Sequence, residues 1–119
     1  MIVLKRGMII DVNLDPTKGS ETGRIGPCVV VTNDIYNERV PVIQVVPITE
    51  WSAKKALIKT NVEIYPSSDN GLSKKSIADS LQTRPIDHRL RMVKIRGRLS
   101  TDKVQEISQS LKLVFDLNA

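Results

Sequence analysis

The polar stretch 15–27 constrains the fold most, because it separates two strong β-strand patterns. Before it, every second residue of 8–14 is apolar, as expected of a half-buried strand. After it, the run 28–31 is apolar without interruption, which is typical of a strand covered on both faces. The glycines, prolines and small polar residues between them argue against a regular element. We therefore expect a long polar loop between two rigid strands, a frequent place for binding residues.

Shorter patterns indicate the other elements. Alternating or continuous apolar residues favour strands, and clusters of proline, glycine, asparagine and serine favour turns. These patterns predict a turn or short helix over 35–41, a buried strand over 42–48, a second polar loop over 49–55, a short strand over 61–64, a turn over 66–71, a strand over 76–82, a helical turn over 87–90 and an alternating strand over 92–97.

The C-terminal segment has the pattern of an amphipathic helix. Ser100 can cap its start, and Asp102 in the first turn suits the helix dipole. Leu99 and Val104 stand where a hydrophobic staple forms. Several short strands with one terminal helix predict an α+β fold, a small, curled, barrel-like antiparallel sheet in one domain over 1–119. The apolar face of the helix is predicted at Val104, Ile107, Leu111 and Val114 or Phe115.

The composition restricts the kinds of site that the chain can build. It has one cysteine, Cys28, and one histidine, His88, so no internal disulfide and no His/Cys zinc site can form. Cys28 lies in an apolar run and is expected to be a core residue rather than a reactive thiol. A carboxylate site for a hard cation stays open, although the sequence shows no cluster of Asp or Glu.

The chain shows no targeting or membrane signal. No apolar run approaches the roughly 20 residues of a membrane span. The N-terminus lacks the apolar region and the cleavage site of a secretory signal. A single cysteine agrees with a reducing compartment. We therefore expect a cytoplasmic protein that does not enter a membrane.

Basic residues gather in one segment of a chain whose net charge is +5. Such a cluster suits a polyanion, such as nucleic acid, or an acidic protein partner. A solvated strand face is the alternative. The cluster consists of Arg84, Arg89, Arg91, Lys94, Arg96 and Arg98, with Asp87 as its only acid.

Several short motifs follow one another in an informative order. They are Lys5-Arg6-Gly7, Leu14-Asp15-Pro16, Gly19-Ser20-Glu21, the segment from Pro27 to Asp34, Val46-Pro47-Ile48-Thr49, Gln82-Thr83-Arg84 followed by Asp87 and Arg89-Leu90, and Gly97-Arg98-Leu99-Ser100. In their order and spacing, from Lys5 to Leu117, they resemble the MazF/PemK (Kid) family of toxins.

The resemblance implies an SH3-like barrel with a C-terminal helix, acting as a homodimer. It implies the toxin of a type II toxin–antitoxin pair, an mRNA interferase that cuts single-stranded RNA at short specific sequences. No metal takes part in the implied reaction: the ribose 2′-hydroxyl attacks the neighbouring phosphate, leaving a 2′,3′-cyclic phosphate and a 5′-hydroxyl. An acidic, partly disordered antitoxin would cover the RNA groove.

The resemblance also assigns the catalytic positions. In the family, an arginine directly before the loop's proline is central, and a threonine after the second buried strand assists. The threonine is present as Thr49, but Gly26 stands at the arginine position. A guanidinium suits the charged phosphorane, so its loss predicts an attenuated enzyme. Arg24, two residues earlier, is the candidate to reach the same phosphate.

The family positions also suggest which residues contact RNA. Trp51 is either a base-stacking residue or part of the dimer contact. We expect a homodimer groove lined by residues 17–27 and 49–55. The expected RNA contacts are Lys18, Ser20, Glu21, Ser52, Gln82 and Arg84.

Two other functions stay open. The first is a non-catalytic module with the same fold that binds RNA or an antitoxin. Only Gly26 favours it. The family's fold also hosts gyrase-poisoning toxins, against which the segments 46–49 and 82–84 favour the ribonuclease.

Overall fold

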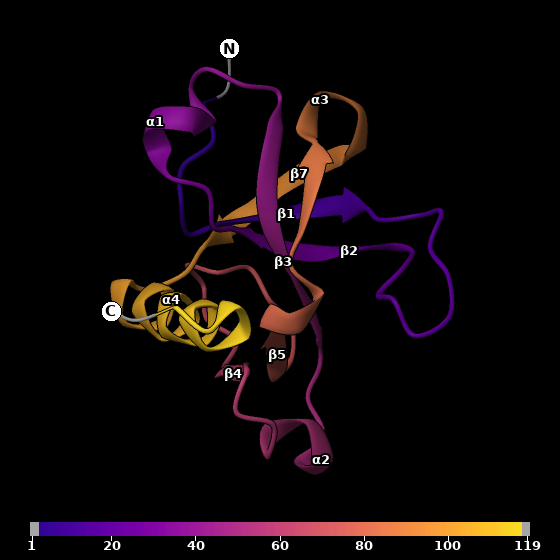
Figure 1. Ribbon diagram of the computed structural model, residues 1–119, viewed down its shortest axis with the longest axis vertical. Helices are drawn as coiled ribbons and strands as arrows, with labels where there is room; N and C mark the ends of the chain where they lie inside the picture. The colour runs from indigo at the N-terminus through magenta and orange to yellow at the C-terminus, as the bar shows by residue number, and fades with distance from the viewer. Residues whose placement is uncertain (1–2, 118–119) are drawn as a thin grey trace.

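Seven strands form one curled antiparallel sheet in the computed structural model, which describes residues 3–117 (Figure 1). The elements in chain order are β1 (Met8–Asn13), β2 (Ile25–Val30), α1 (Asp34–Asn37), β3 (Val42–Glu50), α2 (Ala53–Ala56), β4 (Asn61–Ile64), β5 (Ser76–Asp79), the 3-10 helix η1 (Ser80–Gln82), β6 (Arg84–Asp87), α3 (His88–Arg91), β7 (Met92–Arg98) and α4 (Thr101–Phe115).

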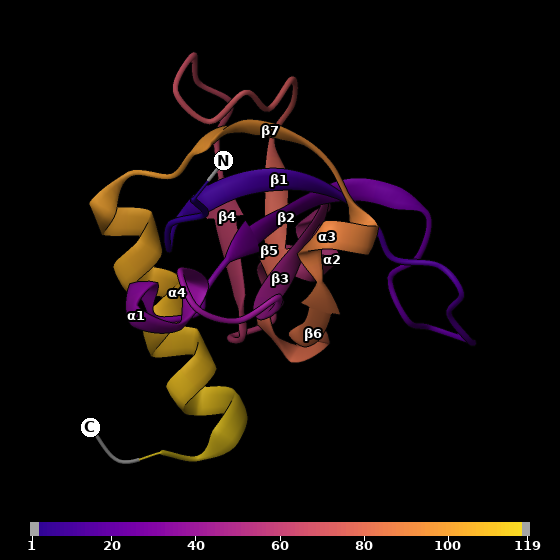
Figure 2. The same ribbon diagram turned by 90° about the horizontal axis from the view of Figure 1, so that it is seen from above.

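Strand β3 joins the two halves of the sheet. The strand order is β4-β5-β3-β2-β1-β7, and β6 pairs with β3 outside this path. Along one edge β3 pairs with β2, and along the other it pairs first with β6 and then with β5. Each pair is antiparallel, which confirms the predicted α+β fold with its C-terminal helix. In both views α4 and the loop between β1 and β2 lie on opposite sides of the sheet (Figures 1 and 2).

Alternation along the strands divides the apolar side chains between two clusters. In β1, Ile9 enters one cluster, whereas Ile10 and Val12 enter the other. The first cluster lies under α4, which contributes Ile107 at 1% exposure. The second fills the curl of the sheet and includes Cys28, as the sequence predicts for a core thiol.

Helix α4 follows its sequence pattern closely. The Ser100 hydroxyl accepts a hydrogen bond from the Lys103 N–H at 3.3 Å, as expected of an N-cap. Leu99 is buried and Val104 packs on the same cluster. The apolar face ends at half-buried Val114, because Phe115 points into solvent. None of the described helices is both long and apolar enough to cross a membrane.

Three predicted element boundaries are wrong. Strand β2 begins at Ile25, so Gly26 and Pro27 belong to the strand, where they pair with β1. Strand β3 extends to Glu50, because it pairs with β5 beyond its last pair with β2. Thr49 is therefore also a strand residue. The expected strand 76–82 ends at residue 79 and continues as η1. No sequence pattern predicted β6, where Pro85 is tolerated because this strand pairs only with β3 among the described residues.

A buried ion pair fastens the turn 65–71 to the sheet. Asp11 on β1 is 5% exposed, and both its carboxylate oxygens accept from Arg96 of β7, at 2.8 and 3.2 Å. A further Arg96 nitrogen donates to the Gly71 carbonyl at 3.0 Å. The backbones approach so closely that a Cβ on Gly97 would lie 2.2 Å from the Asp69 carbonyl oxygen. Only glycine fits at this position.

Candidate functional site

Hydrogen bonds between residues of the loop itself hold the connection between β1 and β2 in shape. The Leu14 N–H donates to the Arg24 carbonyl at 2.9 Å, and the Arg24 N–H donates to Asp15 Oδ1 at 2.9 Å. Near the tip, the Lys18 N–H donates to the Glu21 carboxylate at 2.7 Å, and the Glu21 N–H donates to the Lys18 carbonyl. These hydrogen bonds give the loop a defined conformation.

Three side chains from the second half of the chain clamp this loop. The Gln82 amide accepts from the Thr22 N–H and donates to the Ser20 carbonyl, each at 3.2 Å. Arg84 donates to the Leu14 carbonyl at 2.9 Å. Arg91 donates to the carbonyls of residues 13 and 15 at 2.9 and 2.7 Å. We call Gln82, Arg84 and Arg91 the loop clamp.

A hollow of about 530 Å³ lies between the loop and the segment 81–84. Its lining brings together three of the predicted RNA contacts, Glu21, Gln82 and Arg84. Lys18 and Ser20 are exposed on the same loop. The expected groove combined this loop with residues 49–55, but those residues do not line this hollow. The full set lining it is Pro16, Glu21, Thr22, Leu81, Gln82, Thr83 and Arg84.

Gly26 and Thr49 lie beyond the same end of the β2–β3 ladder. The last paired residues there are Cys28 and Pro47, and Gly26 and Thr49 each lie two positions further out. Alternation places Gly26 on the Cys28 face and Thr49 on the Pro47 face, which is the same face of the sheet. A Cβ on Gly26 would meet nothing within 4 Å. The position is open to a large side chain.

Arg24 immediately precedes β2 but does not continue its alternation. Its φ of 65° is in the left-handed region, which non-glycine residues seldom adopt. The backbone bonds to Asp15 and Leu14 hold it there. The side chain is exposed, and its direction is set by this turn rather than by the pleat of β2. Sequence spacing alone therefore does not align Arg24 with Gly26.

The predicted contacts in the second loop have structural partners. The Ser52 hydroxyl accepts from the Lys55 N–H at 3.1 Å and caps α2. The indole N–H of Trp51 donates to Glu63 at 3.1 Å. The Lys75 ammonium lies 4.0 Å from the centre of the Trp51 ring. Trp51 thus belongs to a cluster formed by the end of β3, by β4 and by the start of β5.

Many cations of the segment 84–98 are bonded within the chain. Besides the two arginines of the loop clamp, Arg89 pairs with Asp87 at 3.1 Å and Arg96 with buried Asp11. Arg98 is exposed. The charge of this segment predicted a polyanion surface and did not indicate that two of its arginines hold the β1–β2 loop. No local signal could have shown that role, because the acceptors are backbone carbonyls far away in the chain.

Cys28 lies directly behind the open end of the ladder but offers no nucleophile. Burial raises the pKa of its thiol to about 12, although the charge of Arg84 acts in the opposite direction. The thiol is therefore neutral at physiological pH. Within residues 3–117, no three His, Cys, Asp or Glu side chains are placed to hold a metal ion.

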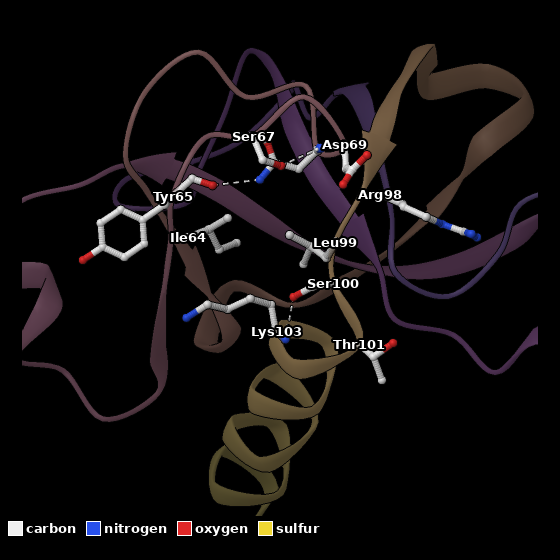
Figure 3. A pocket seen from close by; sticks show the side chains of 10 residues that line it. Ile64, Tyr65, Ser67, Asp69, Arg98, Leu99, Ser100, Thr101 and Lys103 are labelled. Atoms are coloured by element: carbon white, nitrogen blue, oxygen red, sulfur yellow. Dashed lines mark hydrogen bonds between the residues drawn. The ribbon is translucent and has the colours of Figure 1, made fainter.

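A second hollow, of about 650 Å³, opens at the start of α4 (Figure 3). Ile64, Tyr65, Leu99 and Lys103 line it, together with Arg98 of the basic segment, but none of the predicted catalytic or RNA-contact residues does. Figure 3 shows the Ser100 cap at its floor. We therefore place the candidate site at the loop and the β2–β3 ladder end instead.

Comparisons with known proteins show a family and a fold that agree with this structure. A family model described as PemK-like, MazF-like toxin of type II toxin–antitoxin system matches residues 5–115. The chain is 33% identical to endoribonuclease MazF9 of Mycobacterium tuberculosis, with 97% of this chain and 98% of that protein covered. The crystal structure of MazF from Deinococcus radiodurans superposes with a TM-score of 0.81 at 22% identity, covering 98% of this chain and 99% of that one. A mycobacterial endoribonuclease in complex with its cognate antitoxin superposes with a TM-score of 0.74 at 17% identity, covering 96% of each chain.

Proposed function

The chain belongs to the PemK-like, MazF-like toxins of type II toxin–antitoxin systems, and on that premise we propose that it is an endoribonuclease that cleaves single-stranded RNA. The observation that carries the proposal is the position of Gly26 and Thr49. They lie on one face of adjacent strands, beyond the last pair of their ladder, and the space at Gly26 is open. A phosphate placed there would contact both positions.

The proposed reaction transfers a backbone phosphate from the 5′-oxygen of one nucleotide to the 2′-oxygen of the ribose that already carries it at the 3′-oxygen. The 2′-oxygen forms a bond to phosphorus, its proton passes to a base, and the bond from phosphorus to the 5′-oxygen breaks as that oxygen takes a proton. The products are a 2′,3′-cyclic phosphate and a 5′-hydroxyl. We propose that the Thr49 hydroxyl donates to the charged phosphorane. In this proposal the reaction uses neither a metal nor a cofactor.

Gly26 makes this chain a weak catalyst in our proposal. Glycine offers no charge, donor or proton where a guanidinium would stabilise the phosphorane. The loss of one such donor generally costs roughly 10²–10³ in rate. Arg24 is the cation that could partly replace it, since its side chain is exposed beside the start of β2.

RNA binding depends on different groups from those that perform the chemistry. Lys18, Ser20, Glu21 and Ser52 are at least partly accessible, and Gln82 and Arg84 line the hollow. Because the Gln82 amide and Arg84 already bond the loop backbone, they contact RNA only by sharing or exchanging these partners. We propose that the protein acts as a homodimer and that an acidic antitoxin covers the same surface.

A single comparison tests the activity. The chain and its Gly26→Arg variant are incubated with a randomised single-stranded RNA pool in EDTA, and the product ends are identified. Gly26→Arg should raise the cleavage rate by about 10²–10³ and leave cyclic phosphates. Gly26→Lys is the matched control, because it restores the charge without the planar fork and should gain less.

Gly26 also favours a second candidate function, a non-catalytic module that binds RNA or the antitoxin. In that case the folded Gly26→Arg variant would bind RNA and still not cleave it. This outcome would overturn the ribonuclease proposal.

A further inference from the structure

The outer face of the β3–β5–β4 sheet carries an aromatic slot next to Thr49. The register places Thr49, Ile77 and Glu63 in one row across the three strands. The backbone N–H of Trp51 donates to the Lys75 carbonyl, so the pairing between β3 and β5 continues past the ends of both strands. This adds one more row of side chains on the same face. That next row consists of Trp51, Lys75 and Tyr65, which we call the aromatic slot.

The slot holds an ammonium between two rings. Lys75 Nζ lies 4.0 Å from the centre of the Trp51 ring and 5.0 Å from that of Tyr65. The Trp51 indole N–H donates to Glu63 at 3.1 Å, which fixes the orientation of the ring. Tyr65 is 57% exposed, and Trp51 and Lys75 are half-buried, so the slot opens to solvent.

The slot is continuous with the candidate catalytic position. Thr49 lies in β3, and Trp51 directly follows the last residue of that strand and keeps its pairing with Lys75, so their Cα atoms lie about 7 Å apart with side chains on one face. An extended RNA strand whose phosphate reaches Thr49 would place a neighbouring base over this row. From this geometry we infer that the aromatic slot is a base-stacking subsite for single-stranded RNA, an inference that rests on the proposed function.

Lys75 occupies the slot in the free protein and is the group that a base displaces. Its flexible four-carbon stem lets the ammonium leave the rings and meet the phosphate beside the stacked base. Stacking of a base on an aromatic ring is generally stronger than an exposed cation–π contact, so the exchange is favourable. Any base can enter, because every base has an aromatic face.

The chain's only tryptophan makes the subsite directly observable. Trp51 fluorescence is titrated with a randomised pool of 2′-O-methyl RNA 12-mers, which cannot be cleaved by 2′-hydroxyl attack, while anisotropy of labelled RNA measures total binding. We expect saturable quenching. Trp51→Leu keeps an apolar side chain in the row next to buried Ile77 and should weaken binding about 5- to 100-fold. Trp51→Phe should recover most of that loss.

Two matched controls separate the slot from general effects. Tyr65→Leu should weaken binding, whereas Tyr36→Leu should not, although both tyrosines are 57% exposed. Lys75→Gln should reduce the slope of log K against log salt by about 0.7 to 1, whereas Lys112→Gln on α4 should not change it. Thermal melts check that each variant is folded.

The outcomes keep this inference apart from the proposed function. If RNA binds with wild-type affinity in folded Trp51→Leu and Tyr65→Leu and Trp51 fluorescence does not respond, the subsite is wrong while the ribonuclease proposal stands. If Trp51 responds to an acidic peptide such as poly-glutamate but not to RNA, the slot serves a protein partner and the inference is also wrong. If RNA does not bind to any form, the proposed function fails together with it.

Discussion

Gly26 and Thr49 occupy equivalent places on neighbouring strands, each two residues beyond the Cys28–Pro47 pair that ends their ladder. Both positions therefore share one face and one opening of the sheet. The relationship joins Thr49, which the family resemblance assigns to catalysis, with Gly26, which stands where the same resemblance predicts an arginine. It also defines which substitutions probe the chemistry and which probe the fold.

The first prediction concerns coupling between these two positions. In a Gly26→Arg background, Thr49→Ala should lower the cleavage rate by about 10- to 100-fold, because a positioned donor to the phosphorane is lost. In the present chain the same substitution should have a smaller effect. A double-mutant cycle on single-turnover rates measures the coupling. Strictly additive effects would show that the two positions do not act on one phosphate.

The second prediction concerns Arg24. Its φ of 65° makes alanine an unsuitable probe, whereas glycine removes the guanidinium and keeps the left-handed backbone. Arg24→Gly should leave the free energy of unfolding within about 1 kcal/mol of the parent, because relief of the backbone strain opposes the added chain entropy. If Arg24 partly replaces the missing arginine, residual RNA cleavage should fall further. Unchanged cleavage would remove Arg24 from the mechanism and leave it as a turn residue.

The third prediction concerns the loop clamp. Gln82→Leu removes both hydrogen bonds to the loop, so the Thr22 amide should exchange its hydrogen about 5- to 10-fold faster, as expected for a lost bond of roughly 1 kcal/mol. Because the loop then has to be ordered on binding, KM for RNA should rise more than kcat falls. Gln105→Leu, an exposed glutamine on α4, is the control. Equal Thr22 exchange in both variants would contradict the clamp.

The fourth prediction concerns pH and Asp34. Its carboxylate accepts from the Arg6 N–H at 2.6 Å and from the Asn37 amide, and these bonds lower its pKa below the ordinary value of 3.8. A carboxyl whose pKa is lower in the folded state stabilises the fold at pH values above its unfolded-state pKa. This contribution is lost as the pH falls through the folded-state pKa. Asp34→Asn should therefore lower the melting temperature at pH 7, and the difference from the parent should shrink as the pH falls below 3.8.

Melting curves of the chain and of Asp34→Asn between pH 2 and pH 7 measure this difference. Asp69→Asn, at another exposed carboxylate, is the control. A constant difference at all pH values would mean that the Asp34 charge does not contribute.

Local sequence patterns determined the elements whose signals are local. The alternation over 8–14 and the apolar run after Pro27 correspond to β1 and β2, because the side chains of a strand point alternately to its two faces. Ser100, Leu99 and Val104 mark the start of α4 because capping and the staple involve residues only a few positions apart. Burial of Cys28 follows from the apolar run around it.

Only the tertiary structure decided how these elements form a site. The Gln82 and Arg84 bonds to the loop join residues 60 and 70 positions apart, and Arg91 reaches across 76. Their partners in the loop are backbone N–H and carbonyl groups, which nearly every residue has, so no side-chain pattern specifies them. The extension of β3 to Glu50 likewise depended on β5 arriving beside it.

The sequence by itself thus determined an α+β chain with a long polar loop between two strands. Through the family resemblance it also predicted a catalytic threonine at position 49 and a glycine where an arginine is expected. The tertiary structure turned that stretch into a clamped loop, set Gly26 beside Thr49 and aligned Trp51, Lys75 and Tyr65 in one row. The physical reason is that strand register between distant segments is a collective result of burial and hydrogen bonding over the whole sheet.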